Sequence, residues 1–83
     1  MKLVRVVWYD VYSDSLWYCK EDIMSSESIR CVSVGFLIEE NEREVKLCHT
    51  VSDVDLVMGK LIIPKGMIRK MEEIGDNESI LQE

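Results

Sequence analysis

The pattern of apolar and polar positions predicts a series of short β-strands, beginning with residues 2–9 (KLVRVVWY). This segment is rich in valine and aromatic residues, which favour strands. Because successive side chains of a strand point to opposite faces, Val4, Val6 and Trp8 are expected to share one face. A first strand over residues 2–9 follows from this pattern.

Two further alternating segments predict a β-hairpin. Residues 29–40 (IRCVSVGFLIEE) have the clearest strand pattern, and residues 44–51 (EVKLCHTV) alternate again. A short polar loop around Asn41 joins them, as in antiparallel hairpins. Gly35 lies inside the first of these strands, where a glycine indicates a bulge or a sharp bend.

The remaining segments in the first two thirds of the chain give weaker signals. Asp10 opens a polar turn or loop, because Asp and Ser favour turns. Residues 16–19 (LWYC) predict a brief strand or an extended edge piece. Residues 20–28 (KEDIMSSES) predict one helical turn followed by a serine-rich loop. Residues 52–59 (SDVDLVMG) are expected to form a connecting loop.

Residues 59–74 (GKLIIPKGMIRKMEEI) contain apolar residues at helix-like spacings, but Pro64 and Gly66 interrupt them. Pro64 lacks a backbone donor and biases the preceding residue toward an extended conformation. Gly66 weakens a helix by about 1 kcal/mol relative to alanine. The preferred interpretation is a strand over 59–63, one tight 3₁₀ turn over 64–68 and a short closing strand over 69–74. A helix over 65–74 is the alternative.

These elements predict an all-β chain of five to six short antiparallel strands with a 3₁₀ turn before the last strand. Such a series is typical of a small, strongly bent sheet or barrel. With 83 residues there is room for one domain, expected over residues 1–75. Residues 76–83 are expected to form a frayed C-terminal tail.

Composition narrows the classes of function. Hydrophobic residues make up 47% of the chain, which excludes disorder as its main state. A chain of this length has a small core, and association into a homo-oligomer is one way to reinforce it. The net charge of −6 opposes direct binding to nucleic acid, whose affinity depends largely on Lys and Arg.

Cysteine usage and hydropathy predict a cytoplasmic protein. Cys19, Cys31 and Cys48 are an odd number without close pairs, so they are expected to be reduced and buried. The sequence shows no secretory leader and no apolar run near the ~18 residues that a membrane-spanning helix needs. No membrane association is therefore expected.

Aromatic residues provide the first candidate binding surface. Five of the six aromatic side chains lie within residues 8–18. Trp8 and Phe36 are expected to be core residues, but a domain of this size cannot bury every ring. The sequence therefore predicts an exposed partner-binding surface, which comprises Tyr9, Asp10, Tyr12, Trp17 and Tyr18.

Basic residues provide the second candidate, because Lys65, Arg69 and Lys70 cluster around the predicted turn. Together with backbone donors they could hold a phosphate or a carboxylate. The alternative is a solvated rim that keeps an apolar segment soluble.

Catalytic and metal-binding chemistry finds little support. His49 is the only histidine, and adjacent strand residues such as Cys48 and His49 face opposite sides. Asp53 and Asp55 lack the additional ligands of a calcium loop, so a solvated loop is expected. No catalytic residue, metal or cofactor is predicted.

Several short motifs resemble those of a family of small phage and prophage proteins. They are WYD (8–10), a later tryptophan at position 17, SVGFL (33–37) and IPKGMI (63–68). The resemblance spans roughly residues 3–74. It implies an SH3-like small barrel, with IPKGMI as the turn before the final strand, and it implies no catalytic residue.

The expected function is that of a non-enzymatic binding protein, namely a phage accessory protein that binds a host or viral protein in the host cytoplasm. The alternative is an oligomeric binder that sequesters a nucleotide-like small molecule. It would use the aromatic rings for stacking and Lys65, Arg69 or Lys70 for phosphate. A structural role in a virion is a third, less supported interpretation.

Overall fold

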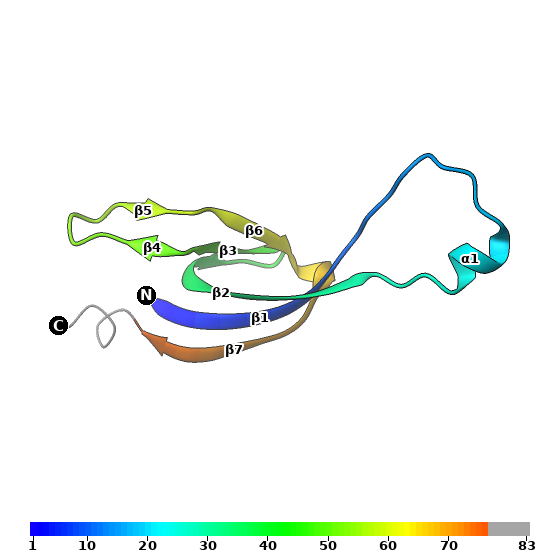
Figure 1. Ribbon diagram of the computed structural model, residues 1–83. Helices are drawn as coiled ribbons and strands as arrows, with labels where there is room; N and C mark the ends of the chain where they lie inside the picture. Colours follow the sequence, from blue (N-terminus) through cyan, green and yellow to red (C-terminus); the bar gives the residue numbers. More distant parts are fainter. Residues whose placement is uncertain (77–83) are drawn as a thin grey trace.

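The computed structural model describes residues 1–76, which form a curved five-stranded antiparallel sheet and a smaller two-stranded sheet (Figure 1). The strand order of the large sheet is β6-β3-β2-β1-β7. Its strands are β1 (Lys2–Asp10), β2 (Ile29–Glu40), β3 (Glu44–Cys48), β6 (Leu61–Pro64) and β7 (Ile68–Asp76). The small sheet pairs β4 (Thr50–Val51) with β5 (Val57–Met58). A short helix α1 (Lys20–Met24) and a 3₁₀ turn η1 (Lys65–Met67) complete the described elements.

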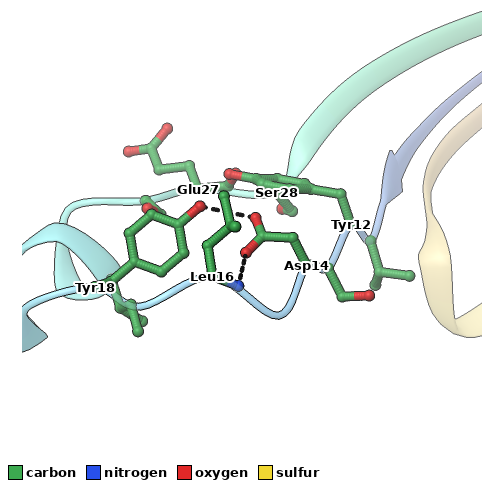
Figure 2. Close-up of a pocket in the computed structure, with 10 residues that line it drawn as sticks. Tyr12, Asp14, Leu16, Tyr18, Glu27 and Ser28 are labelled. Carbon is green, nitrogen blue, oxygen red and sulfur yellow. Dashed lines mark hydrogen bonds between the residues drawn. The ribbon is translucent and has the colours of Figure 1, made fainter.

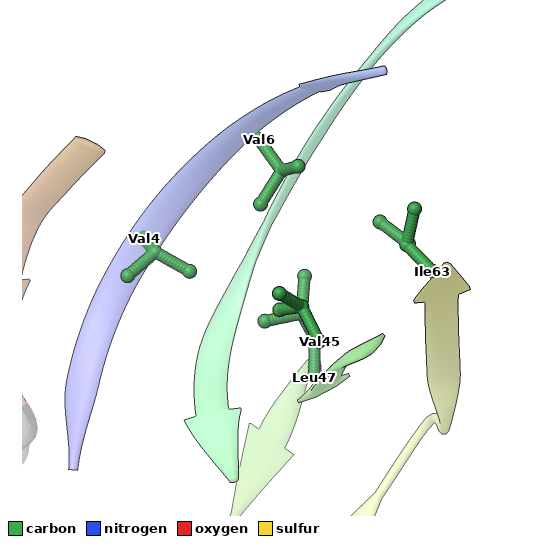
Figure 3. Close-up of a cluster of buried hydrophobic side chains, with 5 residues drawn as sticks. All are labelled: Val4, Val6, Val45, Leu47 and Ile63. Carbon is green, nitrogen blue, oxygen red and sulfur yellow. The ribbon is translucent and has the colours of Figure 1, made fainter. Parts of the chain in front are cut away.

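The core lies on the inner face of the curved sheet (Figure 3). Its fully buried side chains come from β1, β3 and β6, and they are Val4, Val6, Val45, Leu47 and Ile63. Trp8 is partly buried and packs against this cluster. The predicted shared face of Val4, Val6 and Trp8 is thus confirmed.

Phe36 is also buried, with 8% of its surface exposed, but it lies outside that cluster. It stands opposite Leu3 in the β1–β2 register. Leu3 is the strand neighbour of the inward-facing Val4, so its side chain points to the outer face. Because directly opposite residues of an antiparallel pair share a face, Phe36 also lies on the outer face of the sheet. The prediction of a buried Phe36 is confirmed, although the ring belongs to the other face.

The structure settles the two interpretations of residues 59–74. Strand β6, turn η1 and strand β7 follow one another, so the predicted strand, 3₁₀ turn and strand are confirmed and the helix over 65–74 is wrong. The missing amide of Pro64 falls at the last position of β6, an edge strand of the sheet, where proline is tolerated. Strand β7 continues through Gly75 to Asp76, and the remaining predicted tail, residues 77–83, lies outside the described residues.

Two other predictions need correction. Residues 16–19 are not a strand, because no other segment pairs with them. Residues 44–51 are divided at His49 into β3 and β4, and part of the predicted loop 52–59 forms β5. The predicted helical turn is confirmed as α1, and the hairpin around Asn41 as the β2–β3 pair.

The large sheet is open. Strands β6 and β7 are its two edges and do not pair with each other, so no closed barrel forms within residues 1–76. Two irregularities in the β1–β7 pairing, between Leu3 and Val4 and between Val7 and Trp8, interrupt the register. Such irregularities increase the local twist of a strand.

The molecule is elongated, with principal extents of 55 × 26 × 21 Å. Its radius of gyration is 16.6 Å, whereas a compact chain of this length has about 12 Å. Figure 1 shows the reason: residues 11–28, called the arm below, extend from one end of the sheet, and the β4–β5 hairpin extends from the other. None of the helices between residues 1 and 76 has the length and apolar character needed to span a bilayer.

Candidate functional site

The arm is the largest segment that contributes nothing to the core. Every residue from Val11 to Ser28 is exposed. Trp17 is 100% exposed, and the other large apolar side chains of the arm are at least half exposed. They are Val11, Tyr12, Leu16, Tyr18, Ile23 and Met24. Exposed apolar patches of this kind are a common feature of interaction sites in proteins, so the arm is the first candidate site to consider.

A pocket of about 510 Å³ lies between the outgoing and returning parts of the arm (Figure 2). The outgoing part supplies Val11, Tyr12, Ser13, Asp14, Leu16 and Tyr18. The returning part supplies Ile23, Ser26, Glu27 and Ser28. The volume is within the range of pockets that bind small molecules or side chains.

Hydrogen bonds hold the walls of this pocket. The Tyr12 hydroxyl donates to the carbonyl oxygen of Glu27 at 2.9 Å and so links the two parts of the arm. The Tyr18 hydroxyl donates to Oδ2 of Asp14 at 2.8 Å, and the Leu16 amide donates to Oδ1 at 3.0 Å. Asp14 is therefore fixed through both carboxylate oxygens, and it orients Tyr18.

Helix α1 forms the far end of the arm. Cys19 directly precedes the helix, and its thiol donates to Oδ2 of Asp22 at 2.9 Å. The hydroxyls of Ser25 and Ser26 donate to the carbonyl oxygen of Asp22 at 3.1 and 2.7 Å. Serine competes in this way with the backbone amides of a helix, which explains why α1 ends after one turn.

The charge of the pocket is negative. The hydrogen bond from the Leu16 amide, and then that from Tyr18, lower the pKa of Asp14 below its usual value. The same bond to Asp14 raises the pKa of Tyr18 above its usual value. At neutral pH the site thus presents a carboxylate and a neutral phenol. The residues that line it include the acids Asp14 and Glu27 but no lysine or arginine.

The structure brings together only some of the predicted partner-binding residues. Tyr12 and Tyr18 face the pocket, whereas Trp17 is on the arm but not among the lining residues. Tyr9 and Asp10 end strand β1 outside the pocket, and Tyr9 is 38% exposed. The expected exposure of all four aromatic side chains is confirmed, and their role in binding stays a prediction.

Sequence reasoning missed the apolar walls of the pocket. Val11, Leu16 and Ile23 are apolar residues, which are assigned to a core by default. The one sequence feature that sets this segment apart is its lack of periodicity, since residues 10–28 as a whole show neither the period of a strand nor that of a long helix.

The predicted anion-binding cations do not converge. Lys65 contacts Oε2 of Glu40 at 2.6 Å, and Nζ of Lys70 lies 3.7 Å from Oε2 of Glu72. Arg69 and Lys70 are neighbours on β7, so their side chains leave opposite faces of the strand. Lys65 is thus paired with a carboxylate, whereas Lys70 shares Glu72 with Arg5, which lies closer at 2.9 Å. The role of the three cations in anion binding stays a prediction.

The remaining candidate residues occupy ordinary positions. Only Cys48 is buried among the three free cysteines, so the expected burial is wrong for Cys19, which is exposed, and only partial for Cys31. His49 is exposed and its Nδ1 lies 2.6 Å from the Thr50 hydroxyl. Asp53 and Asp55 lie exposed in the loop between β4 and β5, as expected of a solvated loop. Residues 1–76 contain no group of three or more side chains placed to hold a metal ion.

No protein-family model, curated protein or solved structure matches this chain. Its function must therefore be inferred from the geometry of the arm and the sheet.

Proposed function

We propose that this chain is a non-catalytic protein-binding module and that the arm is its contact surface. The observation that carries the proposal is that every residue from 11 to 28 is exposed, among them Trp17, Tyr12 and Tyr18. Tryptophan and tyrosine are enriched among the residues that dominate protein interfaces. Their two side-chain torsions also make them inexpensive to immobilise on binding.

The surface area supports the same proposal. The chain exposes 6712 Å², about 1,600 Å² more than a compact monomer of 9.7 kDa. A stable protein–protein interface buries about 800 Å² on each partner. The arm shares this excess with the β4–β5 hairpin, which also extends from the sheet, and the excess is larger than the area that one partner loses in such an interface.

The charge of the arm indicates what kind of partner it fits. The arm carries the acids Asp14, Glu21, Asp22 and Glu27 and the single base Lys20. A partner surface with an apolar groove and a basic rim would complement it. Given the resemblance of the motifs to phage and prophage proteins, we propose a host or viral protein in the cytoplasm as that partner.

The scaffold of the module is proposed to be an SH3-like barrel that is left open between β6 and β7. Three features support this assignment: the strand order β7-β1-β2-β3-β6, the long arm after the first strand, and the 3₁₀ turn before the last strand. In this proposal the sheet holds the two ends of the arm, Asp10 and Ile29, in register as a directly opposed pair.

The alternative, a nucleotide-like ligand held by Lys65, Arg69 or Lys70, has no comparable support. Ion pairs occupy Lys65 and Lys70, and none of the three lines the arm pocket. Protein binding is therefore the function that we develop.

The test is cross-linking through position 17. A photoreactive amino acid in place of Trp17 should cross-link one protein in a lysate of a bacterial host, and that protein is then produced in pure form. Its affinity is measured by calorimetry for the wild type and for Trp17→Ala. A loss of about 2 kcal/mol or more is expected, as for a hot-spot residue.

Leu56→Ala is the matched control, because Leu56 is 67% exposed on the hairpin at the other end of the molecule. It should leave the affinity unchanged. Equal losses for both variants, or no specific cross-link at position 17, would contradict the proposal.

A further inference from the structure

The arm pocket combines aromatic walls with one fixed carboxylate. Tyr12, Tyr18 and Asp14 line it together, as Figure 2 shows, and Val11, Leu16 and Ile23 add apolar surface. Glu27 also lines the pocket, but its side chain is turned away from Asp14 in this view, so Asp14 is the carboxylate that Tyr18 contacts. A ligand in this space would meet phenol rings, aliphatic carbon and negative charge.

Asp14 retains capacity to accept further hydrogen bonds. Each of its oxygens accepts one bond, from Leu16 on one side and from Tyr18 on the other. A carboxylate has about four lone-pair sites, so two sites stay available. Since no cationic side chain lines the pocket, nothing among the residues described here neutralises this charge.

These two features select the charge of the ligand. A cation gains from the carboxylate through a charge-assisted hydrogen bond and from the faces of the tyrosine rings through their quadrupoles. The aliphatic stem of a lysine or arginine packs on apolar walls while its charged end reaches a polar group. An anion would meet like charge at Asp14 and no donor cation.

We propose that this pocket receives a basic side chain, Arg or Lys, of the partner protein. The inference rests on the proposed protein-binding function and names the chemistry that the arm recognises. Asp14 binds the cationic group, Tyr12 and Tyr18 flank it, and Leu16 and Ile23 contact its stem. The hydrogen bond from Tyr12 to Glu27 keeps the two walls together before binding.

The test uses three short peptides in place of the partner: acetyl-Leu-Arg-Leu-amide, its lysine counterpart and its citrulline counterpart. Citrulline has the shape of arginine without its charge. Binding is followed by nuclear magnetic resonance through the ring signals of Tyr12 and Tyr18 and the amide signal of Leu16. We expect the arginine or lysine peptide to shift these signals in a saturable manner, and the citrulline peptide to bind at least about fivefold more weakly.

Two isosteric variants separate the local charge from the net charge. Asp14→Asn keeps the shape of the side chain and should weaken binding of the basic peptides about fivefold or more. Asp53→Asn makes the same charge change on the exposed loop between β4 and β5 and should have no effect. Circular dichroism confirms that both variants keep the fold of the wild type.

Equal binding of the citrulline peptide, equal weakening by Asp14→Asn and Asp53→Asn, or no shift with any peptide would overturn this inference. The outcome is distinguishable from that of the cross-linking experiment. A partner captured at position 17 together with a pocket that ignores basic peptides would leave the protein-binding function intact and remove only the pocket assignment.

Discussion

Gly35 packs directly against the backbone of Cys48. A Cβ atom at position 35 would lie 2.8 Å from the carbonyl oxygen of Cys48 and 3.3 Å from Cβ of Leu47. Gly35 is buried on the inner face of β2, opposite Val4 of β1. Of the bulge or sharp bend expected at Gly35, the bulge is not at this residue, since the register shift of β2 falls between Leu37 and Glu39.

We predict that Gly35→Ala destabilises the fold. The added methyl group meets a backbone oxygen, so strand β3 must shift, and such overpacking costs about 1–3 kcal/mol. Urea denaturation measures the change in the free energy of unfolding. The control is Gly66→Ala, where an added Cβ has no neighbour within 4 Å. This variant should leave the stability unchanged or raise it by up to about 1 kcal/mol. Equal stabilities of the two variants would show that the close approach of β2 and β3 is unimportant.

Gly59 is predicted to be intolerant of substitution for a different reason. Its φ of +81° lies in the left-handed region, where a side chain costs about 1–2 kcal/mol. An added Cβ would also lie 1.8 Å from Cδ2 of His49, so that ring must rotate and leave Thr50. Thermal unfolding of Gly59→Ala should therefore show a larger loss in the wild type than in a His49→Ala background. Identical losses in both backgrounds would mean that the imidazole moves without cost.

The Asp14–Tyr18 pair should give the arm a pH-dependent local structure. Because the pKa of Asp14 is lowered, its contribution is present above the usual carboxyl pKa and is lost as the pH falls through the lowered value. Because the pKa of Tyr18 is raised, its contribution is present below the usual phenol pKa and is lost as the pH rises through the raised value. The pair is thus intact between these limits. Titration by nuclear magnetic resonance should show that Tyr18→Phe raises the pKa of Asp14 and that Asp14→Asn lowers the pKa of Tyr18. If neither substitution moves the partner's pKa, the hydrogen bond is absent in solution.

The cysteines should differ in reactivity. Cys19 is exposed on the arm, whereas only 3% of Cys48 is exposed and burial raises the pKa of its thiol. The thiolate is the reactive form, so Cys48 should react last with an alkylating agent. Mass spectrometry after brief labelling should find the adduct on Cys19 first, and denaturation should remove the difference. Early labelling of Cys48 would indicate that β3 opens readily.

Local chemistry predicted most of the sheet. Pro64 and Gly66 act on their own backbone, and for this reason the turn before the last strand was predictable. The alternation of Val4, Val6 and Trp8 likewise identified the core face. The strand predicted over residues 16–19 is absent, because a strand requires a partner and the sequence of a segment does not reveal whether another strand lies beside it. The division of residues 44–51 at His49 depends in the same way on pairing with β5.

The candidate site was predictable only in outline. Five aromatic side chains near one another exceed what a small core can bury, and Tyr12, Trp17 and Tyr18 are indeed exposed. The pocket itself depends on contacts between the two parts of the arm, such as that of Tyr12 with Glu27. No periodicity encodes a contact of this kind, so Glu27 and Ile23 could not be assigned to the site from the sequence.

The pairing of β1 with β7 has a consequence for how the chain acquires its structure. Arg5 reaches Glu72 across a sequence separation of 67 residues, and β1 is hydrogen-bonded on both sides only when β7 is in place. Contacts between residues far apart in the sequence slow folding, because the chain between them must first close into a loop. During synthesis β1 leaves the ribosome well before β7, so it must wait with one edge open until β7 has been made. Misassembly in that interval is a hazard for a nascent strand as rich in valine as β1.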